Sequence, residues 1–131
     1  MKIKWDDTLS VGLEMIDEEH KTLISKINDV SEAISKGMGE AQVAQTIEFL
    51  RDYSKKHFSA EENIMETKKY PLTADHKAKH AEFISTIDEI EKDFTEDGAT
   101  KQLAEAINNL LANWLKKHIR ETDTKLARYI S

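Results

Sequence analysis

The sequence predicts an all-α protein: an antiparallel up-down-up-down four-helix bundle with an extended N-terminal arm. Two observations support this prediction. After residue 12, glycine and proline interrupt the chain only in the short segments 36–40, 70–73 and 96–100. Between these breaks, apolar residues recur every three or four positions, which is the period of an amphipathic helix. Because the connections are short, we expect consecutive helices to run in opposite directions.

The first predicted helix opens at Asp17, a good N-cap residue, and ends before Gly37. Residues 1–16 do not continue this helix, because their apolar side chains favour odd-numbered positions, as in an extended segment. We therefore expect one domain, with residues 1–16 as an arm across the bundle and residues 17–131 as the bundle and a C-terminal tail. The apolar stripe of the first helix consists of Leu23, Ile27, Val30 and Ile34.

The stripes of the other three helices contain histidine as well as apolar residues. The third helix is expected to begin after Pro71, with Thr73 or Asp75 as its N-cap. The stripes are Val43, Ile47, Leu50, Ser54, His57, Glu61 and Met65 in the second helix, His76, His80, Phe83, Ile87, Ile90 and Phe94 in the third, and Leu103, Ile107, Leu110, Trp114 and His118 in the fourth.

Composition excludes several classes of function. The chain has 131 residues, of which 34% are charged, and a net charge of −6, which argues against a nucleic-acid partner. It contains no cysteine, so disulfides and thiolate metal sites are excluded, and we expect the reducing cytoplasm as its location. No apolar run is long enough for membrane insertion, and no phosphate-binding loop or Ser/His/Asp nucleophile pattern is present.

All five histidines are predicted to lie at one level of the bundle. His20 and His57 are equally far in sequence from the first break, and Glu61 and His80 are equally far from the second. His80 and His118 are nearly equally far from the third break. At about 1.5 Å per residue, these offsets place histidines from all four helices at nearly one height. Buried imidazoles without partners cost on the order of several kcal/mol, and a bound metal removes this cost. The sequence therefore predicts a metal site.

Carboxylates complete the predicted ligand set. Glu61 shares the stripe of the second helix, whereas Glu62 is rotated by about 100° and is expected to face solvent. In the fourth helix, helical phase favours Glu121, and Asp123 would need a π-type bulge to point inward. Five histidines exceed what one tetrahedral zinc uses, and imidazoles mixed with carboxylates suit iron, copper, nickel or zinc. Bundles of this kind hold two-metal carboxylate sites between facing helices.

The residues that orient the imidazoles are not evident from the sequence. Glu18 and Glu19 precede His20 directly, and we expect them to be first-turn charges favoured by the helix dipole.

Four segments resemble the single-domain bacterial hemerythrins: "DEEHK", "HFSAEE", "HKAKH" and "HIRETD". The order His, His-x3-Glu, His-x3-His, His-x4-Asp is complete, and the resemblance favours Asp123 over Glu121 in the fourth helix. The matching residues are His20, His57, Glu61, His76, His80, His118 and Asp123.

The resemblance implies two iron ions (Fe2+/Fe3+) bridged by an oxo or hydroxo group and by two carboxylates. It assigns His76, His80 and His118 to one iron, His20 and His57 to the other, and the bridges to Glu61 and Asp123. Counting two six-coordinate irons leaves one open position, on the iron with two histidines.

Four apolar residues near the ligands are candidates for an oxygen pocket. The resemblance places Leu115 over the open position, and ordinary core packing would account for all four equally well. They are Leu23, Phe58, Trp114 and Leu115.

The function implied is reversible dioxygen binding by a non-enzymatic monomer, for storage or for delivery to an oxygen-consuming enzyme. Five neutral imidazoles against two carboxylates stabilise high iron oxidation states less than a carboxylate-rich set would, which favours a carrier over an oxidase. The alternatives are a module that senses oxygen, nitric oxide or redox state, and a di-iron oxidase or peroxidase.

Overall fold

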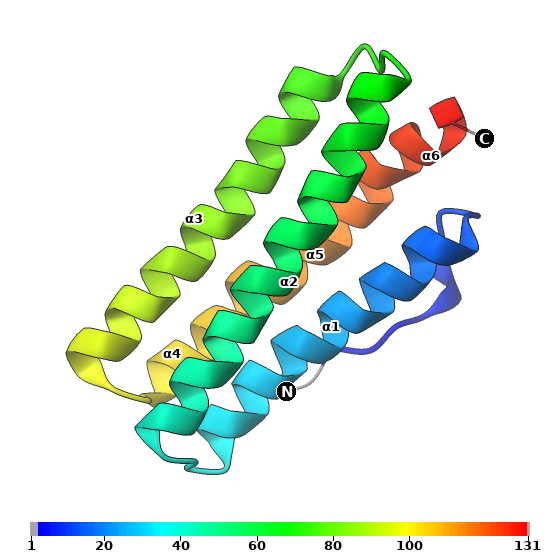
Figure 1. Ribbon diagram of the computed structural model, residues 1–131. Helices are drawn as coiled ribbons and strands as arrows, with labels where there is room; N and C mark the ends of the chain where they lie inside the picture. The colour runs from blue at the N-terminus through cyan, green and yellow to red at the C-terminus, as the bar shows by residue number, and fades with distance from the viewer. Residues whose placement is uncertain (1–2, 131) are drawn as a thin grey trace.

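The computed structural model describes residues 3–130, and these residues form helices and no strand. Four long helical segments pack side by side and alternate in direction (Figure 1). This arrangement confirms the predicted antiparallel four-helix bundle. The segments are α1 (Glu14–Ser35), α2 (Glu40–Thr67), α3 (Thr73–Asp97) and a fourth, continuous segment made of α4 (Lys101–Ala106), the π-helix η2 (Ile107–Ala112), α5 (Asn113–His118), the π-helix η3 (Ile119–Asp123) and α6 (Thr124–Ile130).

The N-terminal arm is shorter than predicted. Helix α1 begins at Glu14, three residues before the predicted N-cap Asp17. The Asp17 carboxylate accepts hydrogen bonds from the Ser10 hydroxyl at 2.6 Å and from the Val11 backbone N–H at 2.9 Å. A typical capping side chain therefore binds the arm instead of starting the helix, because the arm folds back over the first turn of α1.

The arm is also attached near its other end. The Asn28 side chain accepts a hydrogen bond from the Ile3 backbone N–H at 3.0 Å and donates one to the Ile3 carbonyl at 2.8 Å. Between these attachments the arm makes one 3-10 turn, η1 (Asp7–Leu9), whose residue Leu9 is fully buried. The segment expected to lie across the bundle does so through side-chain hydrogen bonds and through apolar side chains, of which Ile3 and Leu9 are buried in the core.

The apolar stripes of the first three helices are buried as the helical period predicts. Helices α1, α2 and α3 contribute, among others, Ile27, Val30, Val43, Ile47, Leu50, Phe83, Ile87 and Ile90 to one continuous core. No helix within residues 3–130 combines the length and the apolar character that crossing a membrane requires.

The stripe of the fourth segment differs from the prediction. Leu110 is 51% exposed, and its neighbour Leu111 is buried instead. Four residues of an α-helix overshoot a full turn by about 40°, and the wider turns of η2 and η3 compensate for this rotation. Inward positions therefore recur every four residues: Leu103, Ile107, Leu111, Leu115, Ile119, Asp123 and Ala127.

Candidate metal centre

Seven buried histidine and carboxylate side chains, all of types that bind metals, meet at one end of the bundle. In Figure 1 this is the end where α1 begins and α2 passes into α3. Every helical segment contributes at least one of them, and none is more than 4% exposed. They are His20 from α1, His57 and Glu61 from α2, His76 and His80 from α3, His118 from α5 and Asp123 from η3.

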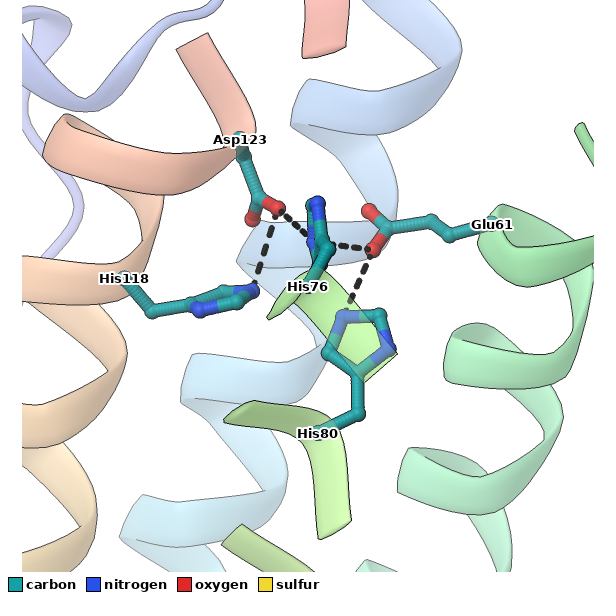
Figure 2. Close-up of side chains that lie close together, drawn as sticks. All are labelled: Glu61, His76, His80, His118 and Asp123. Atoms are coloured by element: carbon teal, nitrogen blue, oxygen red, sulfur yellow. Dashed lines mark ion pairs between the residues drawn. The ribbon is translucent and has the colours of Figure 1, made fainter. Parts of the chain in front are cut away.

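The ligand atoms fall into two groups, each with all its atoms within 4.8 Å of one another. Glu61 belongs to both groups. Figure 2 shows the larger group, in which the imidazoles and the carboxylates point toward a common centre. We call the larger set the three-histidine group (Glu61, His76, His80, His118 and Asp123) and the smaller set the two-histidine group (His20, His57 and Glu61).

Asp123 directs one oxygen toward each group. Its Oδ1 lies 3.0 Å from the Nε2 of His76 and 3.1 Å from the Nε2 of His118. Its Oδ2 lies 3.0 Å from the Nε2 of His20.

The two carboxylate oxygens of Glu61 also face different groups. Its Oε1 faces the Nε2 atoms of His80, at 3.1 Å, and of His76, at 3.6 Å. Its Oε2 faces the Nε2 atoms of His57, at 3.2 Å, and of His20, at 3.8 Å. Both carboxylates therefore have the geometry of bridges between two centres.

The short nitrogen–oxygen distances in the cluster are within ion-pair range but lack the geometry of hydrogen bonds. Ten buried nitrogen and oxygen atoms of His20, Glu61, His76, His80, His118 and Asp123 have no hydrogen-bond partner among the described residues. Each such atom costs about 1–3 kcal/mol when it stays unsatisfied. Adjacent ligands of an octahedral ion, each about 2.1 Å from the metal, lie about 3.0 Å apart, which matches the spacing observed here. The donor set therefore fits metal ions.

Helix η3 decides which acidic residue of the fourth segment joins the cluster. Its π-type turn brings Asp123, five residues after His118, to the same buried face, and Asp123 is 2% exposed. Glu121, which α-helical phase favours, is exposed. The π-type bulge that Asp123 would need in order to point inward is therefore present.

Two further carboxylates bind the outer nitrogens of imidazoles. The Oε2 of Glu19 lies 2.5 Å from the Nδ1 of His57, and the Oε2 of Glu62 lies 2.9 Å from the Nδ1 of His80. From the sequence, Glu62 was expected to face solvent and Glu19 to be a first-turn helix charge, and both expectations are wrong. The comparison of heights that placed Glu61 level with His80 applies to its neighbour Glu62 as well, but height alone does not show on which side of the helix the Glu62 side chain projects.

Aromatic rings cover the three-histidine group. The Phe58 ring stacks on the His80 imidazole with centroids 3.9 Å apart, and the Trp114 ring stacks on the His118 imidazole at 4.5 Å. Of the other two predicted pocket residues, Leu23 is fully buried and Leu115 is 1% exposed. Two surface hollows reach the same group, one of about 450 Å3 at His80 and one of about 290 Å3 at His118.

Carboxylates and burial shift the pKa values within the cluster in opposite directions. Burial lowers the pKa of His57, but the carboxylates of Glu61 and Glu19 outweigh it and raise the pKa to about 9. The pKa of His76 is likewise lowered by burial and raised further by Asp123 and Glu61, to about 9.

The remaining shifts follow the same two causes. Burial lowers the pKa of His118 despite the adjacent Asp123. For Asp123, burial favours the protonated form, but the facing imidazoles dominate and lower the pKa well below its usual range. Without a metal, the cluster thus holds protons on imidazoles next to ionised carboxylates, and a cation would replace these protons.

Comparisons with known proteins agree with this site. The family model described as Hemerythrin HHE cation binding domain matches residues 11–130. Bacteriohemerythrin from Pseudomonas aeruginosa is 35% identical over 91% of this chain and 75% of its own. Bacteriohemerythrin from Stenotrophomonas maltophilia is 33% identical over 94% of this chain and 78% of its own. Myohemerythrin from Theromyzon tessulatum is 31% identical over 93% of this chain and 88% of its own.

The fold agrees as well. A crystal structure of wild-type hemerythrin superposes with a TM-score of 0.85, with 24% sequence identity and 98% of each chain covered. The family model, the relatives and the fold agree on the family of this chain. The chain also has the buried cluster of histidines and carboxylates that a cation-binding domain needs. The chain belongs to the hemerythrin family of cation-binding proteins.

Proposed function

We propose that this protein holds two iron ions and uses them to bind dioxygen reversibly, for storage or for delivery to an oxygen-consuming enzyme. The observation that carries the proposal is the division of the ligand atoms into two adjoining groups that share carboxylates. A single ion would leave one of these groups without a partner. The names of the relatives, bacteriohemerythrin and myohemerythrin, support the same assignment.

The ligands would divide unequally between the two ions. His76, His80 and His118 would hold one iron, and His20 and His57 would hold the other. Glu61 and Asp123 would bridge the pair, since each already directs one oxygen toward each group. The two-histidine group offers fewer nitrogen ligands, so its ion would have room for dioxygen.

The protein contributes a fixed charge and a dry enclosure. The ligand side chains carry two negative charges, from Glu61 and Asp123, and five imidazoles that bind a metal in their neutral form. Phe58 and Trp114 stack on imidazoles of the three-histidine group, and the buried Leu23 and Leu115 are the candidates that would exclude water from the open position. We therefore infer a carrier and not an enzyme.

The test combines iron content with reversibility. Protein loaded with ferrous iron should contain two irons per chain, change its visible spectrum in air, and return to the original spectrum when oxygen is removed. One iron per chain would contradict the proposal. A spectral change that is not reversed on removal of oxygen would favour the oxidase alternative.

A pair of variants tests the ligand assignment. His118→Ala should lose iron, because His118 is a buried ligand candidate, whereas the exposed Glu121→Ala should retain two irons per chain. Equal iron loss in both variants would contradict the assignment.

A further inference from the structure

The five imidazoles differ in whether the Nδ1 atom, which faces away from the cluster, has a partner. Among the described residues, the Nδ1 atoms of His20, His76 and His118 have no hydrogen-bond partner. The Nδ1 atoms of His57 and His80 each face a carboxylate. Because His57 belongs to the two-histidine group and His80 to the three-histidine group, each group has one externally fixed imidazole.

Both carboxylates come from a neighbouring helix. Glu19 on α1 reaches His57 on α2, and Glu62 on α2 reaches His80 on α3. Each contact therefore sets the position of an imidazole relative to a second helix, and not only within its own. Among the described residues, neither Glu19 nor Glu62 forms an ion pair with a lysine or an arginine, so each faces an imidazole in place of a basic side chain.

The burial of these groups makes the contacts effective. The side chains of His57 and His80 are 2% exposed, whereas those of Glu19 and Glu62 are 34% and 29% exposed. Each carboxylate thus stands at the border of the core and closes the outer edge of a buried ring. A charged acceptor at a partly buried edge binds an N–H more strongly than a neutral acceptor does.

An acceptor at Nδ1 determines what the opposite nitrogen can do. When Nδ1 carries the hydrogen and donates it to a carboxylate, Nε2 is left with its lone pair directed into the cluster. The Nε2 of His57 points toward Glu61 Oε2 at 3.2 Å, and the Nε2 of His80 points toward Glu61 Oε1 at 3.1 Å. These are the positions from which the two imidazoles would each ligate a different ion.

We propose that Glu19 and Glu62 are paired positioning residues, Glu19 for the ion of the two-histidine group and Glu62 for the ion of the three-histidine group. Each holds its imidazole in the tautomer and orientation that binds metal. The inference rests on the proposed two-metal site and adds that the affinities of the two ions are controlled separately, from two different helix interfaces.

The test is a titration of metal-free protein with Co(II), which reports binding through its visible spectrum. Removing such an outer carboxylate typically lowers metal affinity by about 10- to 100-fold. Glu19→Ala should weaken one of the two bound ions by this factor, and Glu62→Ala should weaken the other, so the double variant should weaken both. Glu19→Gln and Glu62→Gln should recover part of the affinity, because an amide oxygen still accepts the Nδ1 hydrogen.

Matched controls are available on the same helices. Glu18 on α1 pairs with Lys21 at 3.1 Å, and Glu66 on α2 pairs with Lys77. Glu18→Ala and Glu66→Ala should therefore leave both Co(II) affinities and the Co(II) spectrum unchanged. A general loss of charge or helix stability would affect the controls as strongly as Glu19→Ala and Glu62→Ala.

A second readout identifies the tautomer. In the Zn(II)-loaded protein, which is diamagnetic, the imidazole 15N shifts of His57 and His80 should show hydrogen on Nδ1 and metal on Nε2. In the alanine variants, the affected imidazole should shift while the other one does not.

The outcomes separate this inference from the proposed function. Unchanged Co(II) affinities in both alanine variants would overturn the positioning roles and leave the two-metal site intact. Wild-type protein that binds one Co(II) per chain would contradict the two-metal site. In that case the alanine variant in the group that holds the ion should still weaken it more than its control does, and equality with the controls in both variants would overturn the positioning roles as well.

Discussion

The two ends of the bundle bury different kinds of side chain. At the end where α1 passes into α2, the interior consists of aliphatic and aromatic side chains such as Val43, Ile47 and Ile90. At the other end, the same helices bury imidazoles and carboxylates, ten of whose atoms lack a hydrogen-bond partner among the described residues. Apolar burial stabilises the first end without any ligand, whereas the second end buries polar atoms that a bound cation would satisfy.

This contrast explains how one fold supports a reactive site. The apolar end holds the four helices in register, and that register brings ligands from all of them to a single level. We call the two regions the apolar end and the ligand end. If the apolar end and the ligand end are independent, a substitution at one end should leave the properties of the other end unchanged.

The largest effect is expected for Asp123→Ala. Asp123 directs an oxygen toward each group, so its removal should abolish tight binding of both irons, while Glu121→Ala should retain them. Elemental analysis of the two proteins after loading measures the difference. Two irons per chain in Asp123→Ala would mean that η3 does not provide a ligand.

Removing the metal should destabilise the ligand end selectively. A cation present at a thousand times its dissociation constant stabilises a folded protein by about 4 kcal/mol, and this contribution disappears on chelation. Hydrogen exchange should then accelerate around His20, Glu61 and η3, while amides near Ile47 and Ile90 remain protected. Uniform acceleration along all four helices would show that the two ends unfold as one unit.

The converse change lies at the apolar end. Ile47→Ala should lower the free energy of unfolding by about 2–5 kcal/mol, because Ile47 is 1% exposed and its removal leaves a cavity. Its iron content should stay at two per chain. Phe49→Ala, at a position 50% exposed, is the control and should change the stability by less than about 0.5 kcal/mol. If Ile47→Ala loses iron at temperatures where it is folded, the stability of the apolar end and metal binding at the ligand end are coupled.

Raising the pH should lower the stability of the metal-free protein and raise its affinity for metal. The folded pKa values of His57 and His76 are raised to about 9 by carboxylates, so their contribution to the stability of metal-free protein is complete below about pH 6.5. It is lost as the pH rises through about 9. Burial lowers the pKa of His118, which therefore stays neutral in this range.

Metal binding requires neutral imidazoles, so metal affinity should rise over the same interval. The expected gain is about tenfold per pH unit for each proton displaced. Thermal unfolding of metal-free protein and Co(II) titrations between pH 6.5 and 9 measure the two trends. A melting temperature of the metal-free protein that increases with pH would contradict the assigned protonation.

The smallest effect is expected where the arm meets α1. Asp17→Ala removes the acceptor for Ser10 and Val11 and should cost about 1 kcal/mol, as the loss of a capping side chain does. Chemical denaturation measures this loss, and iron content should be unchanged. A larger loss accompanied by a loss of iron would indicate that the arm supports the ligand end.

Most of the site was accessible to sequence reasoning because it follows local periodicity. His57 and Glu61, like His76 and His80, are separated by four residues, so a regular helix places each pair on one face. Short connections then make the helices antiparallel and bring these pairs to one height. Both inferences use only the geometry of an α-helix, which the side chains of neighbouring helices do not alter.

Three features depended on tertiary structure. A π-type turn shifts the register of a helix by one residue without a distinct sequence signature, so the burial of Leu111 in place of Leu110 was not predicted. Asp17 binds the arm instead of capping α1 because the chain before it folds back. Glu19 and Glu62 became partners of imidazoles because the neighbouring helix supplied a ring at the border of the core.

The sequence by itself determined the four amphipathic helices and the shared level of the histidines, because both result from the repeat of a single helix. Only the tertiary structure decided that Asp123 turns inward in place of Glu121, and which carboxylates reach the outer nitrogens of those histidines. The reason is physical: an inward turn of Asp123 or a contact from Glu62 is favourable only when a partner on another helix is already in place.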